Sequence, residues 1–98
     1  MNSFSKKPLE QYPVIWEFAG LMPPTSRLAS GTVSALDLAD NTDQTGNVLV
    51  SPTAAISGTK ATVTVRGGVN GKMYRLRMQV ALNPDGTITD DILMSVGE

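Results

Sequence analysis

The chain has 98 residues, a formal net charge of −1, and neither histidine nor cysteine. This length predicts one domain with one modest core, and a net charge so close to zero gives no broad attraction to nucleic acid or anionic membranes. Without cysteine and histidine, thiolate metal sites and the commonest catalytic groups are missing, so we expect no enzyme, no metal site and no cofactor. No stretch approaches the roughly 20 apolar residues of a membrane helix.

Residues 1–11 are expected to form a flexible N-terminal arm, and residues 12–98 the folded domain. The arm is polar, and Pro8 and Pro13 favour an extended backbone at the residues that precede them. It lacks the apolar core of a signal peptide, which favours synthesis in a cytosol. Two interpretations stay open: the arm is a disordered tail, or it becomes ordered on a neighbouring subunit.

The first predicted strand lies near residues 14–19, where apolar and other side chains alternate. It contains Trp16, the only tryptophan, and Phe18, and we place both in the core. Pro23 and Pro24 follow and remove the backbone donors that a longer strand would need.

Residues 27–39 are ambiguous between strand and helix. Their many serine, threonine and glycine residues weaken a helix, so we favour a strand with Leu36 and Leu38 facing inward. Residues 40–47 contain no apolar side chain and predict a loop, and residues 48–50 predict a short strand.

Residues 61–66 alternate cleanly and predict a strand with Val63 and Val65 inward. A glycine-rich turn then leads into a long strand that Tyr74 opens. One face of this strand is apolar, with Tyr74, Leu76, Met78, Val80 and Leu82. A Gly-x-x-Tyr sequence at a strand start is typical of the tyrosine corner of Greek-key sandwiches, in which the phenol bonds backbone a few residues upstream.

Residues 83–86, Asn-Pro-Asp-Gly, predict a tight hairpin turn that leads into a last strand at residues 87–96. Asp90 falls on the apolar face of that strand, which a bulge or an exposed edge would explain. Six or seven short strands separated by turns predict an all-β fold, an antiparallel β-sandwich. The residues expected in its core are Trp16, Phe18, Val63, Val65, Tyr74, Leu76, Val80, Ile92 and Met94.

Acidic residues offer no convincing chemistry. Asp90 and Asp91 are adjacent, so they face opposite sides of a strand and cannot act as an acid–base pair. Oxygen ligands gather at Asp37, Asp40 and Asp43, but their spacing does not fit a calcium loop. We expect solvated loop residues there.

Basic residues are the better candidates for a function. Arg75 and Arg77 share one face of the long strand with Met73, and Arg66 precedes the glycine-rich turn. Two interpretations are nearly equal: the solvated outer face of a sheet, or a protein interface, where arginine and methionine are favoured. The candidate interface residues, including those of the arm, are Lys6, Lys7, Arg66, Met73, Arg75 and Arg77.

Three stretches together resemble one family: Val-Ile-Trp-Glu-Phe from Val14, Thr-Val-Thr-Val-Arg-Gly-Gly-x-x-Gly-x-x-Tyr-Arg-Leu from Thr62, and the closing Met-Ser-Val at Met94. The chain resembles, over residues 12–96, the small immunoglobulin-like structural proteins of tailed bacteriophages and prophages, which include fibre–tail adaptor and neck-region proteins. The resemblance implies an immunoglobulin-like, fibronectin type III-like antiparallel sandwich of about seven strands. The family pattern supplies no catalytic residues.

The function that this resemblance implies is that of a virion structural protein in the neck, tail or fibre-attachment region. It would act through contacts with other virion proteins, as a homo-oligomer or in several copies. The alternative is a stand-alone immunoglobulin-like module that binds a carbohydrate or a host surface protein, and a small enzyme ranks last.

Overall fold

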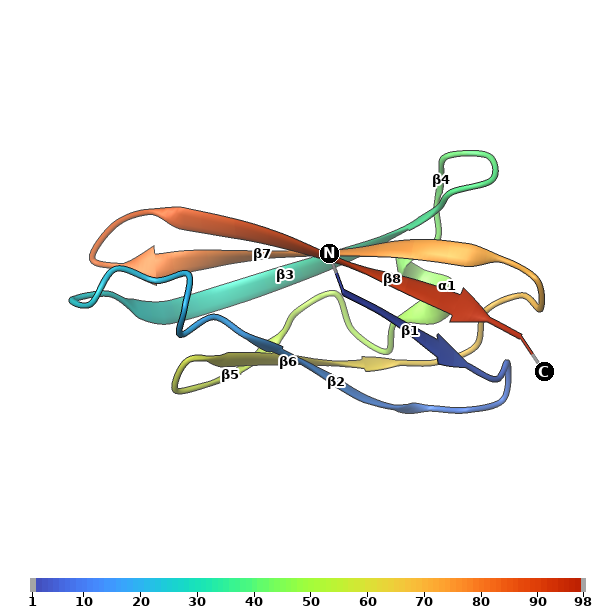
Figure 1. The fold of residues 1–98 in the computed structure, drawn as a ribbon, viewed down its shortest axis with the longest axis horizontal. Helices are drawn as coiled ribbons and strands as arrows, with labels where there is room; N and C mark the ends of the chain where they lie inside the picture. Colours follow the sequence, from blue (N-terminus) through green and yellow to red (C-terminus); the bar gives the residue numbers. More distant parts are fainter. Residues whose placement is uncertain (1, 98) are drawn as a thin grey trace.

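The computed structural model describes residues 2–97, which form two β-sheets packed face to face (Figure 1). Met1 and Glu98, the outer ends of the expected arm and domain, lie outside the described residues. In chain order the elements are β1 (Asn2–Lys6), β2 (Tyr12–Glu17), β3 (Arg27–Asp37), β4 (Thr42–Asp43), α1 (Thr45–Val48), β5 (Ala55–Ser57), β6 (Lys60–Val65), β7 (Met73–Asn83) and β8 (Thr87–Val96).

The larger sheet has five strands in the order β1-β8-β7-β3-β4, and the smaller has three in the order β2-β6-β5. Neighbouring strands pair antiparallel except β1 and β8, which run parallel. The expected all-β fold of two sheets is confirmed, with eight strands among the described residues where about seven were expected. A wholly antiparallel arrangement is wrong, because the larger sheet is mixed. The mixed sheet arises because the first and last strands of the chain lie side by side and run in the same direction.

Strand β1 falls within the segment expected to be an arm. Its sequence, Asn-Ser-Phe-Ser-Lys, has a single apolar residue, so hydrophobic periodicity could not reveal it. Phe4 packs against the core, and the backbone N–H of Gly97 donates to the carbonyl of Lys6 at 3.0 Å. The mobility of residues 1–11 in solution stays a prediction.

The core lies between the two sheets, and all nine residues expected there are buried. The prediction succeeded because β6 and β7 bury every second side chain. Packing in the core is tight at Gly31, where a Cβ atom would lie 3.1 Å from the Cβ of Ala54 and 3.3 Å from the Sδ of Met78. A side chain larger than hydrogen would force these neighbours to move.

Strand β3 is present as favoured, but its inward face is the opposite of the expected one. Val33, Ala35 and Asp37 are buried, whereas Leu36 is half-buried and Leu38 is 37% exposed. The pairing with β7 shifts between residues 28 and 30. After this irregularity the odd-numbered residues of β3 face the core, whereas before it the even-numbered Leu28 does. Asp37 occupies an inward position because a lysine neutralises it, as described below.

Residues 45–48 form the single turn α1 where a loop and the start of a strand were expected. The turn follows from Asp43, whose carboxylate accepts hydrogen bonds from the backbone N–H and the hydroxyl of Thr45 at 2.9 and 2.6 Å. It buries Val48 and Leu49 against the core. Leu49 and Val50 then run beside β6, and only an isolated bridge joins Leu49 to it.

The expected hairpin between β7 and β8 is confirmed, and its Asn83–Pro84 peptide bond is cis. The pairing of β7 with β8 continues through Asp90 without a bulge. Within residues 2–97, β1 pairs with β8 only from Ile92 onward, so Asp90 lies on the half of β8 whose outer edge has no strand beside it in this range. The exposed edge, and not a bulge, explains why an acidic residue is tolerated on this face.

Candidate protein-contact surface

The outward surface of the five-stranded sheet carries three of the six residues proposed from the sequence as an interface. Because Tyr74 and the alternate residues that follow it point into the core, Met73, Arg75 and Arg77 point outward. The pairing register with β3 and β8 supplies their neighbours. We define the Arg75 face as Leu36, Met73, Arg75, Arg77, Asp91 and Leu93.

Arg77 is fixed by an ion pair across the sheet. It lies directly opposite Asp91, and its Nε and Nη2 atoms donate to the two carboxylate oxygens at 2.9 and 3.0 Å. The hydrogen bond from Arg77 holds the pKa of the Asp91 carboxyl below its ordinary value, against the opposing effect of partial burial. Bidentate geometry of this kind orients the guanidinium group, although an exposed pair adds little stability.

Arg75 lies at the centre of the face and has a different environment. It stands opposite Leu36 of β3 and Leu93 of β8, and it is half-buried between these leucines. Its Nε atom is inaccessible to solvent and, within the described residues, has no hydrogen-bond partner. Met73 adds a side chain that is 43% exposed two residues away on the same strand face. Arg75 is therefore an arginine with apolar neighbours on both adjacent strands and one buried donor, Nε, that has no partner among the described residues.

Lys6 lies inside the chain, away from any surface. It is only 2% exposed, and its Nζ atom donates to the carbonyl oxygens of Gly67 and Lys7 at 2.6 and 2.7 Å. Burial lowers the pKa of the Lys6 ammonium group, while the charge of Glu10 acts in the opposite direction. The lysine therefore ties β1 to the loop between β6 and β7.

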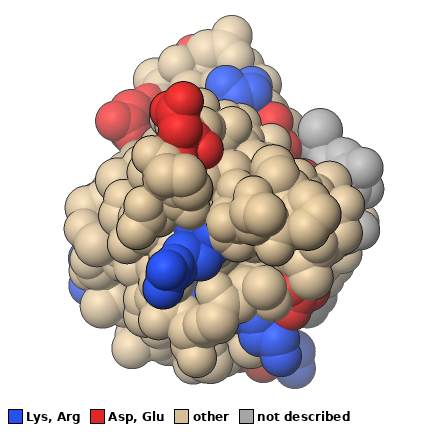
Figure 2. Space-filling model, turned by 90° about the vertical axis from the view of Figure 1, so that its left-hand side faces the viewer, with Lys and Arg blue, Asp and Glu red and all other residues tan. Residues whose placement is uncertain are grey.

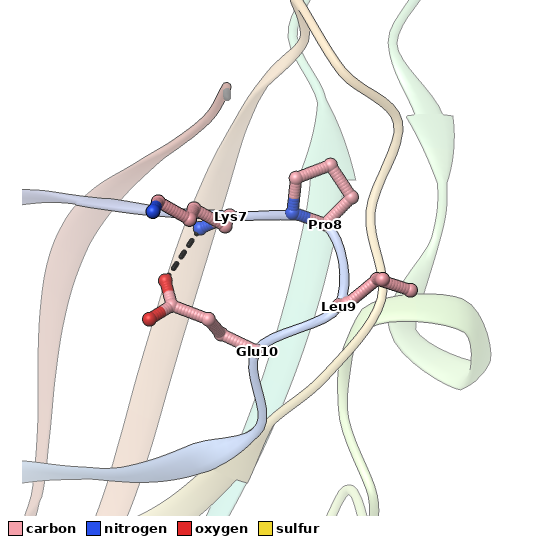
Figure 3. Close-up of a pocket in the computed structure, with 4 residues that line it drawn as sticks. All are labelled: Lys7, Pro8, Leu9 and Glu10. Carbon is pink, nitrogen blue, oxygen red and sulfur yellow. Dashed lines mark hydrogen bonds between the residues drawn. The ribbon is translucent and has the colours of Figure 1, made fainter.

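Lys7 is exposed in the turn between β1 and β2, where its backbone N–H donates to the Glu10 carboxylate at 2.7 Å. Figure 3 shows this turn, in which the side chain of Leu9 points away from those of Lys7 and Glu10. Together with Pro8 these residues line an open cavity of about 370 Å³. Leu9 is 98% exposed, and the cavity pairs no nucleophile with a base.

Arg66 follows β6 in the smaller sheet, and its Nη2 atom donates to the carbonyl of Gly46 at 2.8 Å. It therefore supports the turn α1 and does not join the Arg75 face. The structure thus brings together Met73, Arg75 and Arg77, and separates them from Arg66 and from the lysines of the first segment.

The remaining surface offers little for other kinds of site. Figure 2 shows one end of the molecule, where charged side chains of both signs are scattered among uncharged ones. Among residues 2–97, no group of three or more acidic residues is placed to hold a metal ion, and no helix is long and apolar enough to cross a membrane. All five aromatic residues are buried or half-buried, so within this range there is no exposed aromatic platform for a sugar.

The sequence did not identify the other members of the Arg75 face. Leu36 was expected to face inward, and no sequence pattern marks Leu93 or Asp91 as a contact residue. Hairpin geometry could have placed the last two, since a tight turn at residues 83–86 fixes which residues of β8 face Arg75 and Arg77.

The sequence of the chain is similar to one known protein family. The family model described as podophage GP4 fiber-tail adaptor protein gp77 matches residues 6–95, which is most of the chain. No curated protein matches the chain. The match confirms the resemblance to fibre–tail adaptor proteins. The chain belongs to this podophage fiber–tail adaptor family, and it is a structural component of the phage tail, not an enzyme.

Proposed function

We propose that the chain acts as an immunoglobulin-like contact module, present in several copies per virion, whose Arg75 face binds another protein of the tail or fibre. An adaptor must contact virion proteins on both of its sides. Several small interfaces of this kind, engaged together, reach a high combined affinity without any large individual contact.

Strand order and one side-chain bond support the immunoglobulin-like assignment. The order β2-β6-β5 corresponds to strands B, E and D of such a sandwich, and β8-β7-β3 to strands G, F and C. Tyr74 lies at the start of β7, the F-like strand, and its hydroxyl oxygen accepts a hydrogen bond from the backbone of Val69. A hydrogen bond between this hydroxyl and the backbone a few residues upstream is what a tyrosine corner requires, and it supports the assignment.

The environment of Arg75 is the observation that carries the proposed contact. A buried donor without an acceptor costs free energy in the isolated chain, on the order of 1–3 kcal/mol. Because the Nε atom is inaccessible in the isolated chain, the Arg75 side chain would turn outward to meet a carboxylate or carbonyl group of a partner, which would also bury Leu36 and Leu93. Arginine in an apolar surround is a common centre of protein interfaces.

Two substitutions with the same change in net charge test the proposal. Arg75→Gln and Gln79→Glu each lower the net charge by one, and both residues lie on the outward side of β7. Phage lacking the gene would be complemented with each variant, and fibres per particle counted by electron microscopy. We expect Arg75→Gln to reduce the number of attached fibres and Gln79→Glu to leave it unchanged. Equal fibre numbers for both variants and the wild type would refute a role for the Arg75 face.

A further inference from the structure

We propose that the open edge of β2 takes up an extended segment of a different virion protein as an added strand. This inference rests on the proposed adaptor function, but it concerns a different surface from the Arg75 face. In the described part of the chain β2 pairs with β6 and with no other strand. In an immunoglobulin-like sandwich strand A occupies this position, whereas here β1 has joined the other sheet.

The hydrogen bonds around β6 identify the backbone groups of β2 that face the open edge. The N–H of Val50 donates to the carbonyl of Thr64 at 3.0 Å, so the backbone groups of Thr64 point away from β2. Pro13 lies opposite Thr64 and therefore turns its own backbone away from β6. Alternation then places the N–H and C=O groups of Ile15 and Glu17 at the open edge.

Two further observations agree with this assignment. The N–H of Phe18 donates to the carbonyl of Thr59 at 2.9 Å, as expected if even-numbered residues of β2 bond toward β6. Pro13 has no N–H to donate, and proline is tolerated in a strand where that group would face an open edge.

The interior beside this edge is incompletely covered. Inward-facing side chains of the central strands, such as Val63 and Leu76, are buried, whereas on β2 only Trp16 is buried and the two inward residues before it are half-buried. The half-buried residues on this flank of the core are Phe4, Tyr12, Val14 and Ile88.

The rings of Phe4 and Tyr12 are 6.2 Å apart, and the Tyr12 hydroxyl donates to the carbonyl of Ser5 at 3.2 Å. These contacts close the flank at one end, where β1 lies over β2 (Figure 1). Farther along β2, Val14 is half-buried. An apolar side chain of an added strand would cover this flank, so the partner segment requires apolar residues on its inward side.

Apart from β1, which ends the five-stranded sheet, the other edges have features that discourage pairing. Strand β5 has three residues and β4 has two. The open half of β8 presents Asp90 on its inward side, and the free side of β3 is bonded to Pro52 and Gln44. Short strands, inward charges and covering loops are the usual means of protecting an edge.

Strand β2 lacks these features. Its sequence has no basic residue, and Ile15 is 56% exposed on the outer surface of the sheet. The carboxylate of Glu17 is already engaged, because it accepts from the Thr59 hydroxyl and the Ala19 N–H at 2.6 and 2.9 Å. Its one residue of a kind that protects edges is Pro13. An open edge of this kind is suited to strand addition, in which backbone bonds give affinity.

The number of backbone hydrogen bonds that each pairing could form favours a different protein over a second copy of this chain. A symmetric pair of β2 strands centred on Ile15 would place each Pro13 opposite Glu17 of the other copy. Each proline lacks an N–H, so two Glu17 carbonyls would stay unbonded in such a dimer. A partner without proline at these positions leaves only one acceptor unbonded.

Two substitutions at one position separate backbone pairing from side-chain contact. Ile15→Pro removes the backbone N–H that faces the open edge and leaves the hydrogen bonds between β2 and β6 intact. Ile15→Thr keeps this N–H and replaces the apolar side chain. Complemented phage would be scored for fibres per particle, and circular dichroism would check the fold. We expect Ile15→Pro to lower fibre occupancy by on the order of tenfold, and Ile15→Thr to retain it. Normal fibre numbers with a folded Ile15→Pro chain would overturn the inference.

Amide hydrogen exchange of the wild-type chain provides a test that needs no variant to fold. We expect the backbone amides of Ile15 and Glu17 to exchange rapidly in the free chain. In assembled particles we expect the amides of β2 to exchange more slowly than in the free chain. Unchanged protection of β2, or a solution dimer that Ile15→Pro dissociates, would overturn the proposal. Absence of the wild-type chain from purified particles would instead refute the adaptor function itself.

Discussion

The hydroxyl oxygen of Tyr74 lies 3.0 Å from the backbone nitrogen of Val69, which donates a hydrogen bond to it. The bond closes the glycine-rich loop between β6 and β7 onto the start of β7. The same loop contains Gly67, whose carbonyl accepts from the buried Lys6 ammonium group at 2.6 Å. This loop is therefore held from two sides, by Lys6 of β1 and by Tyr74 of β7.

Tyr74→Phe removes only the hydroxyl and leaves the ring in the core. We expect the free energy of unfolding to fall by about 1–3 kcal/mol, because the Val69 N–H loses its acceptor. Urea denaturation followed by tryptophan fluorescence measures the change. Tyr12→Phe is the matched control, since its hydroxyl makes a longer bond of 3.2 Å at an exposed site and its removal is expected to cost less. Equal losses for the two variants would mean that the corner adds no special stability.

Lys6→Met tests the other attachment of the loop. Methionine fills similar space but leaves the carbonyls of Gly67 and Lys7 without a donor, so we expect a loss of roughly 1–3 kcal/mol. Amide exchange of β1 is expected to accelerate in this variant, because Lys6 anchors the strand. Lys7→Met is the control, since Lys7 is exposed and a surface change of this kind usually alters stability by less than about 0.5 kcal/mol. Unchanged stability and exchange in Lys6→Met would show that the buried amine is dispensable.

Most of the sandwich could be predicted because its central strands carry their own periodic signal. Strands β6 and β7 bury alternate residues, and the turn at residues 83–86 fixes the pairing of β7 with β8. These features depend on neighbours in sequence. The expected core was correct for the same reason.

The remainder depends on contacts between distant residues. Strand β1 has one apolar side chain and is recognisable only from its pairing with β8, about 90 residues later. The irregularity near residue 29 reverses the phase of β3, and propensity gives no sign of it. The sequence predicts Arg75 on the outer face of its strand. Its apolar neighbours Leu36 and Leu93 lie on two other strands and follow only from the pairing register.

Trp16→Ala tests how much of the stability the smaller sheet contributes. Trp16 is almost completely buried, so its truncation is expected to cost about 3–5 kcal/mol. Trp16→Phe should cost less, because it keeps an aromatic ring and removes the buried Nε1–H, which has no partner among the described residues. Chemical denaturation followed by circular dichroism measures both variants. A Trp16→Phe chain as unstable as Trp16→Ala would show that packing of the indole dominates over its unsatisfied donor.

Acid stability should depend on Asp37, whose side chain is 5% exposed and pairs with Lys72 at 2.9 Å. The hydrogen bond from Lys72 is the main cause that lowers the pKa of the Asp37 carboxyl, a second bond from the N–H of Ala39 adds to it, and burial opposes both. Because the folded pKa is lower than the unfolded one, the unfolded chain binds the proton more readily. The resulting stability is present above the ordinary aspartate pKa of about 3.9, and it is lost as the pH falls through the lowered folded value.

Asp37→Asn should therefore flatten the decline of unfolding free energy from about pH 5 downward. Lys72→Met should flatten the same part of the curve, because it removes the main cause of the pKa shift. Urea denaturation at a series of pH values measures these slopes, and the double variant should show little further flattening, since the two residues act as one pair. Parallel curves for the wild type and Asp37→Asn would show that other carboxyl groups control acid unfolding.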